Sequence, residues 1–121
     1  TGAAKAIGKI FPNLSGKLEG IGVRVPVING SMTDIICNVN KTPNLEQLKS
    51  AFKDSSDGNM KSILEYTDDP IVSTDIIGNT NSCIIDAQLI NVSKNTVRVI
   101  GWYDNEAGYS NRIIDLINRI A

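Results

Sequence analysis

The chain has 121 residues, of which 41% are hydrophobic and 21% are charged, and its formal net charge is −1. This length suits one domain. The high hydrophobic content and the balanced charge exclude a disordered tail. The balanced charge also argues against a protein that binds the phosphate backbone of nucleic acids. The apolar stretches are too short to span a membrane, and the first residues, TGAAKAIGK, lack the layout of a signal peptide.

The chain contains no histidine and two cysteines, Cys37 and Cys83. The lack of histidine excludes catalysis by a Cys–His or Ser–His pair, and the common histidine metal sites, from anything this chain does by itself. Two cysteines are too few for a disulfide framework. Because both lie in apolar, strand-like segments without a neighbouring base, we expect small buried side chains rather than nucleophiles.

The first residues predict a helix. Thr1 is a good N-cap and an alanine-rich turn follows it. The helix is expected to end near Phe11, because Pro12 disfavours helical backbone in the residue before it. The abrupt start without an initiator Met suggests a piece of a longer protein; a processed mature protein is the alternative.

The next part of the chain predicts two strands and a helix. Residues 22–28 and 32–40 are mostly apolar and are expected to be strands. Asn44 and Gln47 then resemble a capping box, which predicts a helix with an apolar face that ends in the polar run 54–59.

Short segments and a hairpin follow. Residues 63–66 and 72–77 are short apolar segments. Residues 82–92 are expected to form a strand, residues 94–95 a turn, and residues 97–103 the antiparallel partner.

The last residues give the clearest helix prediction. Apolar side chains recur at i, i+3, i+4 and i+7, at Ile113, Leu116, Ile117 and Ile120. Taken together, the elements predict an α+β fold with a mixed, mostly antiparallel sheet and helices packed on one face.

Two features are candidate anion sites. The N–H groups of Thr1 and Gly2 lie at a helix start, where they lack partners within the helix and favour negative charge. Arg24 lies within an apolar run, and its planar guanidinium suits a phosphate group. The alternatives are an ordinary helix cap and an arginine that points to solvent.

The most unusual stretch is residues 102–111, which contain the only Trp and two of the three Tyr. It connects a predicted strand to the last helix, where loops often carry function. Asn105 offers both an amide donor and a carbonyl acceptor, as recognition of another carboxamide requires. Alternatively, Asp104 or Asn105 caps the helix and the aromatic side chains belong to the core.

Four segments together resemble the glyceraldehyde-3-phosphate dehydrogenase family. They are TGAAKAIGK at the start, RVPV at residues 24–27, ILEYTDDPIVSTDIIG at residues 63–78 and WYDNEAGYSNR at residues 102–112. They occur in the order expected of the C-terminal part of the catalytic domain, so residues 1–121 are expected to form that part. The family's Rossmann domain, which binds NAD, has no counterpart in this chain.

The resemblance implies a role for five residues. Thr1, Gly2 and Arg24 would bind phosphate, either of the substrate or inorganic. Asn105 would hold the carboxamide of the nicotinamide ring of NAD, and Tyr109 would lie near that ring. The family's nucleophile lies in a Ser-Cys-Thr-Thr-Asn segment followed by a histidine, and neither occurs here. We therefore assign no catalytic residue to this chain.

The same resemblance implies the activity of a whole parent enzyme. It would be a cytoplasmic, homotetrameric, glycolytic enzyme that oxidises and phosphorylates glyceraldehyde 3-phosphate to 1,3-bisphosphoglycerate, with NAD and inorganic phosphate. This chain alone is expected to be inactive, and its parent is expected to be bacterial. The alternatives are erythrose-4-phosphate dehydrogenase and a surface-exposed module that binds host proteins.

Overall fold

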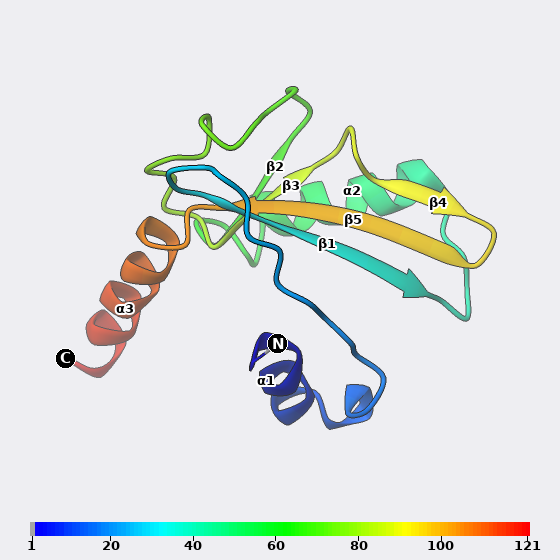
Figure 1. The fold of residues 1–121 in the computed structure, drawn as a ribbon, viewed down its shortest axis with the longest axis horizontal. Helices are drawn as coiled ribbons and strands as arrows, with labels where there is room; N and C mark the ends of the chain where they lie inside the picture. The colour runs from blue at the N-terminus through cyan, green and yellow to red at the C-terminus, as the bar shows by residue number, and fades with distance from the viewer. Residues whose placement is uncertain (1) are drawn as a thin grey trace.

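The computed structural model describes residues 2–121, without the side chains of residues 3–5. Its elements, in chain order, are helix α1 (Gly2–Ile10), the 3-10 turn η1 (Pro12–Leu14), strand β1 (Ser31–Asn38), helix α2 (Leu45–Asp57), strands β2 (Leu64–Thr67), β3 (Cys83–Asp86), β4 (Asn91–Ser93) and β5 (Thr96–Tyr103), and helix α3 (Ala107–Ile120) (Figure 1). This arrangement confirms the predicted α+β fold.

Strand β5 is the centre of the five-stranded sheet. β1 pairs antiparallel with the whole of β5, from Ser31 opposite Tyr103 to Asn38 opposite Thr96. The other edge of β5 is shared by β3 and β4, both antiparallel, and β2 adds to β3 in parallel. The sheet is therefore mixed and mostly antiparallel, as the sequence predicts.

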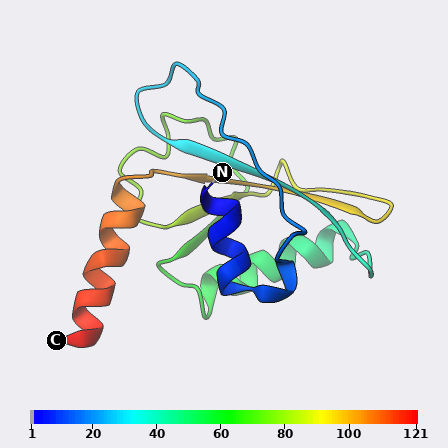
Figure 2. The same ribbon diagram turned by 60° about the horizontal axis from the view of Figure 1, so that its bottom comes forward.

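All three helices lie on the same side of the sheet (Figure 2). α2 begins with the predicted capping box: the side chain of Asn44 accepts from the N–H of Gln47 at 2.7 Å, and Gln47 Oε1 accepts from the N–H of Asn44 at 3.2 Å. Leu48 and Phe52 of α2 then pack against a core cluster of Leu64, Ile85 and Ile90. None of the helices that the structure describes is both long and apolar enough to cross a membrane.

The entry into β1 depends on a glycine. Gly30 has a φ of +93°, in the left-handed region that side chains disfavour. A Cβ added there would come within 2.9 Å of Cδ1 of Ile76, which is buried in the turn at residues 73–78. Gly30 therefore lets the chain pass close to that turn just before the sheet begins.

Three sequence predictions are wrong in part. Residues 22–28 form no strand; they include Pro26, which lacks an N–H for a sheet, and their side chains are exposed. The strand expected over residues 82–92 is two strands, because Asp86 closes a turn by accepting from the N–H of Gln88 at 3.1 Å. Cys37 is exposed on the edge strand β1 and is not buried.

Candidate functional site

The candidate site is built around the loop that connects β5 to α3. Because Ser31 lies opposite Tyr103, the start of β1 is brought beside this loop. The N-terminal residues of α3 follow directly after it. The sheet register thus gathers residues near positions 30 and 105, which are far apart in the sequence.

Asp104 organises this loop. Its side chain is buried, and Oδ2 accepts from the N–H of Gly78 and from Nδ2 of Asn29, both at 2.9 Å. Oδ1 accepts from the N–H of Glu106 at 2.9 Å and of Ala107 at 3.0 Å. These backbone donors, that of Gly78 first, lower the pKa of Asp104 from 3.8 to about 2. One carboxylate therefore joins three chain segments.

The same carboxylate decides between two of the alternatives left open by the sequence. By accepting from the N–H groups of Glu106 and Ala107, Asp104 acts as the cap of α3. Asn105 makes no capping hydrogen bond among the described residues. The side chain of Asn105 is therefore available for another contact.

Asn105 is exposed, and its amide is held from one side. Oγ of Ser31, the first residue of β1, donates a hydrogen bond to Oδ1 of Asn105 at 3.3 Å. Within residues 2–121, nothing accepts a hydrogen bond from Nδ2 of Asn105. The amide thus presents a donor to solvent on the surface of the loop.

The aromatic residues of the stretch divide into two groups. Trp102 is half-buried and its indole N–H donates to Oδ2 of Asp86, which is itself buried, at 3.0 Å. Tyr109, in the first turn of α3, is 69% exposed. Trp102 therefore has a packing role, whereas Tyr109 lies on the surface, four residues after Asn105.

The start of α3 is fixed against the turn that precedes β3. A Cβ on Gly108 would lie 2.9 Å from the carbonyl oxygen of Asn81, so only glycine fits at this approach. Arg112 donates to Oγ of Ser82 at 3.1 Å and to Oδ2 of Asp115 at 2.8 Å. Tyr109 is therefore carried by a helix turn with a fixed position.

Among the described residues, the structure shows no contact between the residues predicted to bind phosphate. Thr1 lies outside the described residues. Gly2 begins α1 with open space around it, and Arg24 is exposed and has no ion-pair partner among residues 2–121. The chain that connects η1 to β1 runs back past α1 on its way to the sheet (Figures 1 and 2). Convergence of the three residues on one anion stays a prediction.

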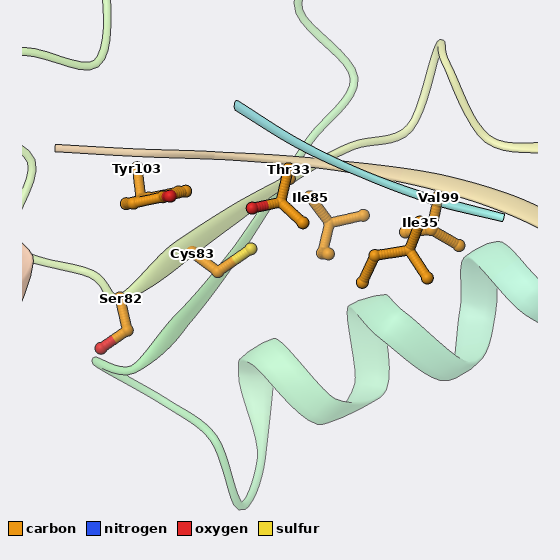
Figure 3. Close-up of a pocket in the computed structure, with 8 residues that line it drawn as sticks. Thr33, Ile35, Ser82, Cys83, Ile85, Val99 and Tyr103 are labelled. Carbon is orange, nitrogen blue, oxygen red and sulfur yellow. The ribbon is translucent and has the colours of Figure 1, made fainter. Parts of the chain in front are cut away.

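A hollow of about 220 Å³ lies on the helix side of the sheet, between β1, β3 and β5 (Figure 3). Cys83 lines it, and burial raises the pKa of the Cys83 thiol. A Cβ on Gly101 would come within 2.5 Å of Sγ of Cys83, so glycine at 101 makes room for the sulfur. The sequence predicts a buried packing residue at Cys83; the side chain is half-buried, packs against the core cluster and lies beside Gly101, so the packing role is supported although the burial is only partial.

Residues 1–105 match the family model described as "Glyceraldehyde 3-phosphate dehydrogenase, C-terminal domain". The chain belongs to the glyceraldehyde-3-phosphate dehydrogenase family. Over all of its length it is 49% identical to a protein of that name from Podospora anserina, and over 97% of its length it is 50% identical to one from Mycobacterium avium. A chloroplastic glyceraldehyde-3-phosphate dehydrogenase of Arabidopsis thaliana is 49% identical over the whole chain.

The chain spans only about a third of these dehydrogenases: 36% of the Podospora protein, 34% of the Mycobacterium protein and 29% of the Arabidopsis protein. The three come from a fungus, a bacterium and a plant, so they do not support the expected bacterial parent. The family match confirms the resemblance stated from the four sequence segments, and the last of these segments contains the loop around Asp104.

Sequence reasoning missed the residues that support the loop. Ser31 and Asn29 lie outside the four quoted segments, and Gly78 ends one of them without a role of its own. Their importance arises from the β1–β5 register and the turn at residues 73–78. The dipeptide Asn29-Gly30 is a turn signal that could have drawn attention to this position.

Proposed function

We propose that this chain is the C-terminal part of the catalytic domain of a longer dehydrogenase. That parent oxidises and phosphorylates glyceraldehyde 3-phosphate to 1,3-bisphosphoglycerate in glycolysis, as a cytoplasmic homotetramer with NAD and inorganic phosphate. One observation carries the proposal: the chain is about half identical, along its whole length, to proteins named glyceraldehyde-3-phosphate dehydrogenase.

The residues of the β5–α3 loop suit the nicotinamide end of NAD. A carboxamide carries one acceptor and one donor group, and the exposed amide of Asn105 can pair with it. Tyr109 offers an exposed ring on the adjacent helix turn. In the proposed function Asn105 binds the carboxamide and Tyr109 lies beside the pyridine ring. NAD itself supplies the hydride acceptor.

Phosphate binding falls to Thr1, Gly2 and Arg24. The guanidinium of Arg24 is exposed and has no ion-pair partner in the described part of the chain, so it is free to bind an anion. The open N-terminus of α1 at Gly2 offers N–H donors and a favourable dipole. Together these groups would neutralise phosphate charge and position it.

The chain holds and orients the reactants, and the rest of the parent supplies the reactive groups. No histidine is present, Cys83 is a half-buried thiol whose pKa is raised by desolvation, and the segment around Cys37 does not match the family's nucleophile. Positioning and charge neutralisation lower a barrier by preorganisation but form no covalent bond. The 121-residue chain alone is therefore expected to produce no NADH.

Two substitutions in the full-length parent test this assignment. Arg24→Ala should raise the KM for inorganic phosphate by about tenfold or more, because a charge-assisted hydrogen bond is lost, and should leave the KM for NAD nearly unchanged. Asn105→Ala should do the reverse. Steady-state rates with each reactant varied in turn provide the measurement.

Lys17→Ala, which removes a charge at an exposed position between α1 and β1, is the matched control and should change neither KM. If Arg24→Ala and Asn105→Ala raise both KM values equally, the two assigned roles are wrong. NADH formed by the isolated chain above the contaminant level would contradict the division of labour between this chain and the rest of its parent.

A further inference from the structure

The segment at residues 78–82, which leads into β3, touches the β5–α3 loop at two points. The N–H of Gly78 donates to Oδ2 of Asp104 at 2.9 Å. The carbonyl oxygen of Asn81 lies so close to Gly108 that an added Cβ would come within 2.9 Å of it. One of these contacts precedes the exposed asparagine of the loop in the sequence and the other follows it. The position of the 78–82 segment therefore sets the position of that asparagine.

Glu65 of β2 holds this segment by its side chain. Oε2 of Glu65 accepts from Nδ2 of Asn79 at 2.8 Å and from Nδ2 of Asn81 at 2.9 Å. Oδ1 of Asn79 accepts from the backbone N–H of Asn81 at 2.9 Å and from its side-chain amide at 3.1 Å. All three side chains are half-buried. One carboxylate oxygen and two amides thus form a closed cluster, which we call the Glu65 cluster.

The cluster fixes the middle of the segment, whereas backbone hydrogen bonds fix its ends. The N–H of Asn79 donates to the carbonyl oxygen of Ile76 at 3.1 Å, and the N–H of Ser82 donates to that of Ile63 at 2.8 Å. Asn81, which lies between them, is held through its N–H and its side chain, both within the cluster. Hydrogen bonds to a charged acceptor are roughly twice as strong as those between neutral groups. The carboxylate of Glu65 is therefore the strongest hold on Asn81.

We propose that Glu65 is a positioning residue for the nicotinamide contact: it holds the 78–82 segment, which in turn holds the β5–α3 loop on both sides of Asn105. The inference rests on the proposed function, since that function assigns Asn105 to the carboxamide of NAD. It goes further because Glu65 lies on β2, two strands away from β5 in the sheet, and its role requires no contact with the cofactor.

Two ligands distinguish a positioning role from a merely structural one. ADP-ribose is NAD without the nicotinamide ring, so it lacks the group that the β5–α3 loop is proposed to meet. A residue that positions this loop should affect the binding of NAD and spare the binding of ADP-ribose. A residue that only stabilises the fold should affect both ligands or neither.

The experiment measures the Kd of NAD and of ADP-ribose by calorimetry, with the full-length parent protein. Glu65→Leu removes the acceptor and should raise the Kd of NAD about twofold to tenfold, the range of one lost hydrogen bond, without changing that of ADP-ribose. Glu65→Gln keeps an oxygen that can accept from both amides and should restore most of the affinity for NAD. Glu46→Leu removes an exposed carboxylate of α2 and should change neither Kd.

Two further substitutions keep the test decisive. Asn79→Ala breaks the Glu65 cluster from the other side and should reproduce the effect of Glu65→Leu with the carboxylate intact. Asn105→Ala tests the proposed function itself: if it leaves the Kd of NAD unchanged, Asn105 does not meet the cofactor and the proposed contact is wrong. If Asn105→Ala raises that Kd, but Glu65→Leu and Asn79→Ala leave it unchanged or weaken both ligands equally, only the role of Glu65 is overturned.

Discussion

At the scale of single residues, the carboxylate of Asp104 is the feature on which the candidate site depends most. Four donors from three segments converge on it, and it is buried. A group whose pKa is lowered by folding stabilises the fold while it is charged. This carboxylate therefore links the order of the β5–α3 loop to pH.

Asp104→Asn is expected to lower the stability of the parent protein at pH 7 and to matter less in acid. The pKa of Asp104 is about 2 in the fold against an ordinary value of 3.8, so its contribution is complete above about pH 5 and is lost as the pH falls toward 2. The urea midpoints of wild type and variant, measured from pH 7 down to about pH 3, should converge.

Asp57→Asn is the matched control for this prediction. Asp57 is the exposed last residue of α2, so the same change of charge there should shift the urea midpoint little, by a similar amount at each pH. A gap between wild type and Asp104→Asn that stays constant down to pH 3 would mean that the carboxylate charge does not stabilise the loop.

At the scale of the elements, β3 and β5 pack closely where the sulfur of Cys83, in β3, lies over Gly101, in β5. Ile85 lies opposite Gly101, and the space above Gly101 is filled by Sγ of Cys83. Gly101→Ala should therefore lower the free energy of unfolding by about 1–3 kcal/mol through overpacking. Chemical denaturation of the parent protein measures this change.

A second substitution tests the cause of that destabilisation. In a Cys83→Ala background the sulfur is gone, so the added methyl group has space and Gly101→Ala should cost clearly less than in wild type. Gly22→Ala, at a position with no heavy atom within 4 Å of the added Cβ, should be nearly neutral. An equal cost of Gly101→Ala in both backgrounds would refute the contact.

The elements that the sequence predicted well are those specified by local signals. The capping box at Asn44 and the apolar periodicity of α3 each depend on a few neighbouring residues, and both were predicted correctly. The strand prediction for residues 22–28 was wrong because their apolar composition is typical of a strand. Pro26 lacks the N–H that a sheet needs, and the side chains of the segment are exposed.

The candidate site was predictable in its residues but not in its geometry. Asn105 and Tyr109 were identified from the sequence, yet Ser31 and Asp104 acquire their roles through the β1–β5 pairing and the turn at residues 73–78. Ser31 is 74 residues away from its partner Asn105 in the sequence, and Gly78 is 26 residues away from its partner Asp104. Local patterns contain no information on such partners.

At the scale of the whole molecule, the chain exposes much apolar surface. The residues of the apolar row on α3 are largely exposed: Ile113 at 43%, Ile117 at 52% and Ile120 at 77%. Exposed contiguous apolar surface is typical of an interface with another chain or another part of the same protein. The 121-residue chain by itself, in whose described part the row is left exposed, should therefore self-associate.

Matched lysine substitutions on α3 test whether the apolar row drives this association. Sedimentation equilibrium of the 121-residue chain should give a mass above 13.1 kDa that rises with concentration. Ile117→Lys should weaken the association at least about tenfold, because burying an isoleucine side chain contributes about 1.5–3 kcal/mol. Asn118→Lys adds the same charge to the next exposed position and should have a smaller effect, since it lies outside the row. A chain that stays monomeric at its solubility limit would show that this surface does not bind a second copy.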